Sequence, residues 1–289
     1  MIVILYRHKA HFRRWEVCFE AREVIMNTAP QPKINYEAVC IQTDHNIGRR
    51  VMPVLNYNTT SSRNAFFDIA RGIRTDCEAV HLFGINTTIG TNFETLYDNG
   101  GGIYTFPAAQ DTLTLASTSG DDTMQVRITG LDDQWREISE VVTLNGTNDV
   151  ETTTEFFRVN DARILGGNNV GDISIDHGAN TVAYIQAEKG VHQAIIYSTP
   201  AGHSLYICTV KFDGTIGLFG TMRFRAMLQD PASDDLVWHF WDSIARTDLD
   251  FDLKIPFKVP EKRDFSIEAR GTQGTNQIAC YLSGVLMED

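Results

Sequence analysis

The chain has 289 residues, of which 43% are hydrophobic, and its formal net charge is −12. This length has room for two domains that each bury a core, and the composition excludes a disordered chain. The acidity argues against bare nucleic acid as a partner, because phosphate contacts need a basic surface.

Cysteine usage indicates a reducing compartment. The five cysteines, at positions 18, 40, 77, 208 and 280, are an odd number and cannot all pair as disulfides. No two have C-x-x-C spacing, so no zinc site is indicated. We expect reduced thiols in a protein made in a cytoplasm, with Cys208 and Cys280 as small core residues.

Residues 1–25 differ from the rest of the chain. A short apolar run at positions 1–6 is followed by basic residues, among them Arg7, Lys9 and Arg13. A signal peptide has the opposite order, and the run is too short to span a membrane, so we expect no membrane partner. One interpretation is that Met26 is the true start and that residues 1–25 are a non-native or poorly packed extension; the alternative, that the chain starts at Met1, stays open.

Residues 26–92 read as an extended anchoring arm with short strands or a helix. Pro30, Pro32 and Pro53 interrupt it, and alone it buries too little surface to be ordered, so we expect it to run over a neighbouring subunit. Residues 61–74 favour a short helix ending at Gly72, with a strand pair through residues 66–70 as the alternative. Residues 78–85 alternate as a strand.

The rest of the chain predicts β-structure, because apolar residues alternate with polar ones in short runs separated by Gly, Asp and Asn. Residues 93–189 form a first domain, in which Asn145-Gly146 predicts a hairpin with arms at 135–144 and 150–159. Residues 190–289 form a second domain. The predicted fold class is all-β: two antiparallel β-sandwich, jelly-roll-like domains in tandem behind the arm.

Asp248, Asp250 and Asp252 have the period-two spacing that places three carboxylates on one face of a strand. Carboxylates are hard oxygen ligands, which makes these residues candidates for calcium. The alternative is a solvated strand face paired with Arg223 and Arg225 on a neighbouring strand. We favour the solvated face, because calcium sites usually draw on loops with backbone oxygens.

Trp238 and Trp241 are candidates for a glycan-binding platform, because aromatic faces stack on sugars. The alternative is that one face of this strand is core, and we favour it. The sequence has no Gly-x-Ser-x-Gly, no phosphate-binding Gly-rich loop with Lys and no His-Glu-x-x-His. We therefore expect no enzyme, no catalytic residues and no cofactor.

Four groups of segments resemble virion structural proteins of tailed bacteriophages, especially those of aquatic hosts. They are residues 67–72 with 80–86, residues 94–107, residues 126–147 with 156–160, and residues 197–203 with 259–270. The most specific is residues 126–147, Val-Arg-Ile-Thr-Gly-Leu-Asp-Asp-Gln-Trp-Arg-Glu-Ile-Ser-Glu-Val-Val-Thr-Leu-Asn-Gly-Thr. Together they cover about residues 66–289, and residues 1–25 match nothing in the pattern.

The resemblance implies a non-enzymatic component of the particle, made in the host bacterial cytoplasm and located in the virion. We expect a head decoration (cement) or capsid-fibre protein that binds the major capsid protein and forms a homo-oligomer, with a trimer favoured. A tail or neck component is the alternative within the class. A carbohydrate-binding receptor module is the alternative outside it.

Overall fold

The computed structural model describes residues 65–215, 222–232, 235–245, 249–272 and 276–289. The chain divides into two units, Met1–Ile73 and Arg74–Asp289. In the first unit the described part contains helix α1 (Ala65–Ala70), which ends where Gly72 adopts φ 66° and the amide of Ile73 donates to the carbonyl of Asp68. This confirms the helix rather than the strand pair. The expectations for residues 1–64 lie outside the described residues.

The second unit is built of antiparallel strands, so the all-β prediction is confirmed. The strands are β1 (Cys77–Ile89), β2 (Glu94–Thr95), β3 (Asp111–Ser117), β4 (Gln125–Leu131), β5 (Glu137–Thr143), β6 (Val150–Phe156), β7 (Arg158–Leu165), β8 (Ile173–His177), β9 (Asn180–Ile185), β10 (Ile196–Ser198), β11 (His203–Thr215), β12 (Met222–Asp230), β13 (Asp235–Ala245), β14 (Leu249–Val259), β15 (Asp264–Gly271) and β16 (Asn276–Glu288).

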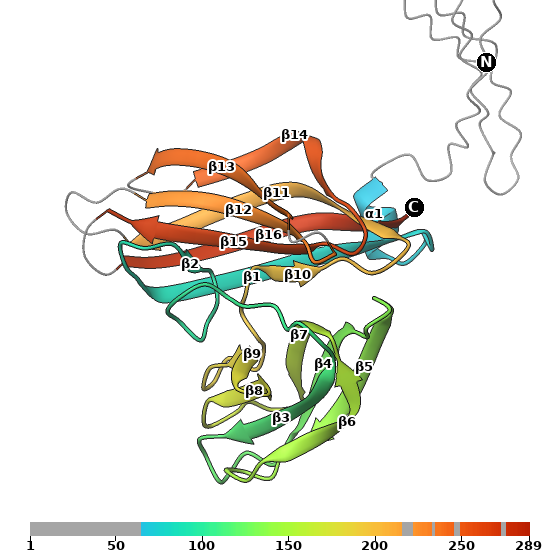
Figure 1. Ribbon diagram of the computed structural model, residues 1–289, viewed down its shortest axis with the longest axis vertical. Coiled ribbons are helices and arrows are strands. Elements are labelled where there is room, and N and C mark those ends of the chain that lie inside the picture. Colours follow the sequence, from blue (N-terminus) through green and yellow to red (C-terminus); the bar gives the residue numbers. More distant parts are fainter. Residues whose placement is uncertain (1–64, 216–221, 233–234, 246–248, 273–275) are drawn as a thin grey trace, which may run out of the picture. The chain divides into compact units, whose positions relative to one another are not determined.

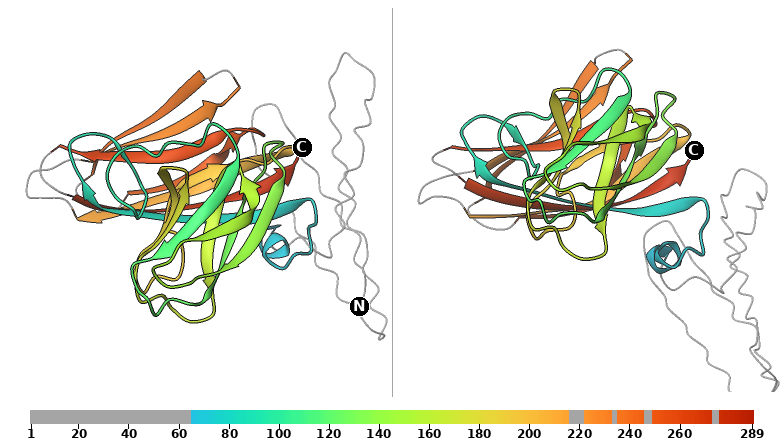
Figure 2. Two further views of the ribbon diagram at one scale, coloured as in Figure 1. Left: turned by 60° about the horizontal axis from the view of Figure 1, so that its bottom comes forward. Right: turned by 90° about the horizontal axis from the view of Figure 1, so that it is seen from below.

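The larger domain has two sheets. One has the order β1-β16-β11-β14, and the other has the order β10-β15-β12-β13 with β2 also paired to β15. The first and the last strand of the second unit, β1 and β16, therefore lie side by side (Figure 1 and Figure 2). Inward-facing residues of both sheets form one core, which includes Leu205, Phe212, Phe224, Phe265 and Leu282.

The pairing in the larger domain is nested along the chain. The first strand, β1, pairs with the last, β16; β2 and β10 both pair with β15; β11 pairs with β14; and β12 pairs with β13. The chain thus runs out as one long antiparallel ribbon and returns along itself. The ribbon is wrapped so that alternate pairs contribute to opposite sheets.

The smaller domain comprises β3 to β9 in two sheets, ordered β6-β3-β8-β9 and β5-β4-β7. Its core is separate from that of the larger domain and includes Leu115, Ile128, Phe156, Ile175 and Ile185. The alternation of buried and exposed residues in β3 and β4 shows why these segments form strands with one face in this core.

The smaller domain is inserted into the larger one, which corrects the expected tandem order. The chain leaves the larger domain after β2 and re-enters it at β10, and these crossings are bridged by Tyr97 and Ala194. Residues 77–89, expected in the arm, are a full strand of the larger domain because they pair with β16. Pairing between strands so distant in sequence is not visible in local alternation.

The turn expected at Asn145-Gly146 is present, but the prediction that its two flanking strands pair with each other is wrong. The turn exists, with Gly146 at φ 61° and a bridge between Asn145 and Asn148. However, β5 pairs with β4 and β6 pairs with β3, so the two arms enter different sheets. The carboxylate of Glu140 on β5 instead accepts hydrogen bonds from the amides of Thr153 and Thr154 on β6.

A buried ion pair joins the two domains. Arg158 on β7 donates to both carboxylate oxygens of Asp264 on β15, at 2.8 and 2.7 Å, and its guanidinium lies 3.8 Å from the ring centre of Phe157. Asp264 also accepts from the hydroxyl of Ser198, at 2.6 Å. Each charge therefore has several partners at the junction, as buried charges require.

Candidate interaction surface

The outer face of the sheet β1-β16-β11-β14 is the surface that we identify as a candidate site. Alternation along β1 turns Val80 toward the core and Phe83 away from it, and Phe83 is 44% exposed. On β16, Cys280 and Leu282 are in the core, so Tyr281 between them points to the same outer face as Phe83.

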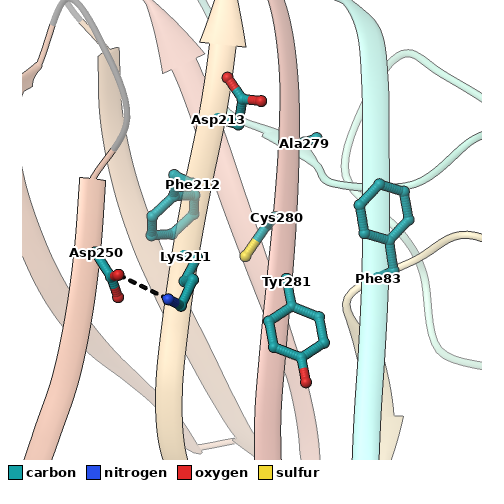
Figure 3. Close-up of a pocket in the computed structure, with 8 residues that line it drawn as sticks. All are labelled: Phe83, Lys211, Phe212, Asp213, Asp250, Ala279, Cys280 and Tyr281. Atoms are coloured by element: carbon teal, nitrogen blue, oxygen red, sulfur yellow. Dashed lines mark hydrogen bonds and ion pairs between the residues drawn. The ribbon is translucent and has the colours of Figure 1, made fainter.

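Strand register aligns four side chains across this face, one from each strand. Phe83 on β1 is paired with Tyr281 on β16, Tyr281 with Lys211 on β11, and Lys211 with Asp250 on β14. Figure 3 shows this order across the sheet. The four lie along a hollow of about 360 Å³ whose complete lining is Phe83, Lys211, Phe212, Asp213, Asp250, Ala279, Cys280 and Tyr281.

The two halves of the face differ in polarity. On the β1 and β16 side it presents the ring of Phe83 and the phenol of Tyr281, which is hydrogen bonded to His81 Nδ1 at 2.8 Å. On the β11 and β14 side, next to the hollow, it presents carboxylates and the cation Lys211, while Lys254 and Lys258 lie further along β14. Lys211 Nζ donates to Asp250 Oδ2 at 2.7 Å, and this hydrogen bond raises the pKa of Lys211.

The described calcium candidates, Asp250 and Asp252, have partners other than the arginines expected for them. Asp250 is bonded to Lys211, and Asp252 accepts from Thr209 Oγ1 at 3.3 Å, whereas Asp248 lies outside the described residues. Arg223 and Arg225 lie on β12, which is paired with β13 and β15 rather than with β14, and Arg225 donates to Glu268 at 2.6 Å. Both described aspartates are exposed on the strand face, and no cluster of three metal-ligating side chains is found among the described residues.

For the glycan candidates the structure describes the backbone of β13 only. Trp238 is paired with Met227 of β12, and Trp241 is paired with Phe224. Phe224 belongs to the core, and Met227, three residues later in the same strand, lies at a position of the opposite face. The paired positions Trp241 and Trp238 therefore also belong to opposite faces of the sheet. The strand register therefore does not favour a single glycan-binding platform that contains both tryptophans.

Sequence reasoning missed the row that begins at Phe83. The alternation of residues 78–85 was visible, but which parity faces the core and which strands lie beside β1 depend on pairing with β16. The exposed phenylalanine is a local signal that becomes informative only when Tyr281 and Lys211 are placed beside it.

Cys280 is in the core as expected, but Cys208 is half-buried. Ile207 and Thr209 pair with the consecutive residues Gly284 and Ser283 of β16, so Cys208 is the extra residue of a β-bulge against β16. Within the described part of the chain, no helix is long and apolar enough to cross a membrane.

Comparison with known proteins identifies no family. No protein-family model matches the chain, and the curated proteins contain no match. Among solved structures, infectious bursal disease virus of the Gt strain is similar at 10% identity and a TM-score of 0.24, over 74% of this chain and 71% of that one. The VP2 subviral particle of the same virus is similar at 9% identity and a TM-score of 0.20, over 74% and 76%.

These TM-scores are too low to establish a shared fold. The resemblance of the sequence segments to tailed-phage virion proteins therefore remains a prediction.

Proposed function

We propose that this protein is a non-enzymatic structural component of a virus particle. The observation that carries the proposal is the nested strand pairing of the larger domain, from β1–β16 inward to β12–β13. Two layers of four and five strands wrapped from one such ribbon support a jelly roll, an architecture used repeatedly in viral capsids and lectins.

The inserted domain supports a role as a projecting module. It has its own core, it is attached through two adjacent crossings, and the Arg158–Asp264 pair holds it to the jelly roll. A second domain on a jelly roll suits a protein that attaches by one domain and presents the other. Fold alone does not fix function, so the sequence resemblance to virion proteins is the second support.

Within the virion class we favour a head decoration or capsid-fibre role, as a homo-oligomer bound to the capsid surface. A trimer would match local three-fold positions of a shell. A tail or neck position is the alternative in this class.

The test is to locate the chain on purified particles. Antibodies raised against residues 98–192 are applied to virions of the source virus, followed by gold labelling and electron microscopy. We expect regular labelling of heads, and mass spectrometry of the same particles should give many copies of the chain per particle. Labelling confined to tails would replace decoration by the tail role.

Absence of the chain from purified particles would overturn the proposal. In that case binding of the full chain to a glycan array, tested beside Trp238→Ala and Trp241→Ala variants, would decide for the receptor module. Glycan binding that both variants retain would reject that function as well.

A further inference from the structure

Around the hollow, the outer face of β1-β16-β11-β14 carries more carboxylates than cations on the β11 and β14 side and aromatic rings on the other side, whereas Lys254 and Lys258 lie further along β14. This local polarity specifies what can cover the hollow. Asp213 and Asp252 on the acidic side are exposed, and among the described residues neither forms an ion pair. The one lysine in the row, Lys211, is already bonded to Asp250. A partner therefore has to bring positive charge to β11 and β14 and apolar groups to Phe83.

The two edges of the sheet also differ. Asp250, Asp252, Lys254, Pro256 and Lys258 lie on β14, and charges and proline are the residues that keep an edge strand from pairing. Between Ala79 and Ile89, β1 has no acidic or basic residue apart from His81. The apolar side of the face thus adjoins the less protected edge.

The sequence contains a segment with the required order. Residues 49–55 read Arg-Arg-Val-Met-Pro-Val-Leu, two cations followed by apolar residues. Because Pro53 lacks an amide hydrogen, this segment is poorly suited to join a sheet as an inner strand. Side-chain contacts across a face make no such demand on the backbone.

The lengths also agree. Neighbouring strands are roughly 4.8 Å apart, so β14 and β1, separated by two strands, are about 14 Å apart. An extended chain advances roughly 3.3 Å per residue, so five steps from Arg50 to Leu55 cover about 17 Å. A segment crossing the strands can therefore place an arginine at Asp250 and Leu55 beside Phe83.

We propose that residues 49–55 of a second copy of this chain bind across the outer face of β1-β16-β11-β14. The arginines face Asp213, Asp250 and Asp252, and the apolar residues cover Phe83 and Tyr281. The choice of a second copy rests on the proposed assembly function. The chemistry of the contact rests on the face and the sequence of the segment.

The test compares molar masses of full-length chains by light scattering at low salt. The single-chain mass is 32.4 kDa. We expect the wild type to have a multiple of it, and Phe83→Asp to fall to the single-chain value. The matched control is Ile255→Asp, because Ile255 is 86% exposed, lies on β14 and is not part of the hollow. It should keep the wild-type mass.

Charge reversal tests the register of the contact. The double variant Arg49→Glu/Arg50→Glu should also give the single-chain mass, and adding Asp213→Arg and Asp250→Arg to it should restore the multiple. Circular dichroism of every variant should match the wild type, since Phe83, Asp213, Asp250 and Ile255 are exposed and lie outside the core.

Three results would overturn the proposal: a wild-type chain of single-chain mass, a Phe83→Asp variant as large as the Ile255→Asp control, or a mass unaffected by reversing both arginines. None of these depends on the particle. A monomeric chain that still labels purified virions would remove this inference and leave the proposed function standing.

Discussion

At the scale of single residues, the junction between the domains depends on one arginine. Arg158 and Asp264 have side chains 3% and 1% exposed, so each charge is removed from water and relies on the other. Removing one partner of such a pair leaves an uncompensated buried charge, which is far more costly than losing an exposed pair.

We expect Arg158→Ala to lower the free energy of unfolding by about 3–5 kcal/mol, measured by urea denaturation. The control is Arg163→Ala, whose pair with Asp161 at 2.6 Å has an arginine side chain 54% exposed. Exposed pairs contribute about 1 kcal/mol or less, so this variant should change little. Equal losses in the two variants would show that the Arg158 pair is not a special contact.

Asp122 is a second residue whose contacts predict a measurable effect. Burial opposes its ionisation, but hydrogen bonds from Ser117 Oγ at 2.5 Å and from the amides of Val170 and Gly171 outweigh burial and lower its pKa. A carboxylate with a lowered folded-state pKa stabilises the fold above its unfolded value and loses this contribution as pH falls through the folded value.

Wild-type protein should therefore lose stability more steeply than Asp122→Asn as the pH falls below about 4, because the variant has no charge to lose there. At neutral pH the variant should be less stable by about 1–3 kcal/mol, because an amide replaces one accepting oxygen with a donor. Thermal unfolding across this pH range measures both effects. Parallel pH profiles for the two proteins would contradict the assignment.

At the scale of elements, the backbone of neighbouring segments lies so close to β1 that Gly84 leaves no room for a side chain. A Cβ on Gly84 would lie 2.6 Å from both the amide nitrogen of Ile195 and the carbonyl oxygen of Leu96. These are backbone atoms of the segments beside the two crossings, which cannot move aside as a flexible side chain can.

Gly84→Ala should consequently lower the free energy of unfolding by roughly 1–3 kcal/mol, the usual cost of overpacking. Gly120→Ala is the control, because a Cβ there meets nothing within 4 Å and Gly120 is not among the glycines with positive φ. Chemical denaturation of both variants gives the comparison, and a neutral Gly84→Ala would mean that β1 shifts freely in its sheet.

The sequence predicted elements better than it predicted their partners. Alternation in short runs within residues 93–189 indicated strands, because half of each strand faces a core, as in β3 and β4. The Asn145-Gly146 turn was also correct, but a turn fixes only its own residues, and the flanking strands joined separate sheets. Cys208 was misplaced since a bulge changes parity in mid-strand, and the sequence does not mark it.

At the scale of the whole molecule, the larger domain depends on the most distant segments of the described chain. Cys77 is paired with Met287, and the second sheet needs β2 as well as β15. No local pattern could reveal that residues 98–192 interrupt this domain. For the same reason the row from Phe83 to Asp250, assembled from four distant strands, could not be found before the register was known.

The two domains should differ in their ability to fold as isolated fragments. Residues 98–192 contain the strands of the inserted domain and all of its core except Tyr97, Ala194 and Ile196, so this fragment should fold and unfold cooperatively. Residues 193–289 lack β1 and β2 and should not form the larger domain alone. Circular dichroism and amide dispersion in NMR spectra measure both, and a folded 193–289 fragment would show that β1 is dispensable.

The two crossings have a consequence for how such a molecule can change over time. Tyr97 and Ala194 are bridge partners, so the points where the inserted chain departs and returns are already adjacent. A short turn could close that gap, and an unrelated domain with neighbouring termini could fill it. The inserted domain could thus be exchanged during evolution. Selection can replace the displayed domain while the sequence and the folding of the larger domain stay unchanged.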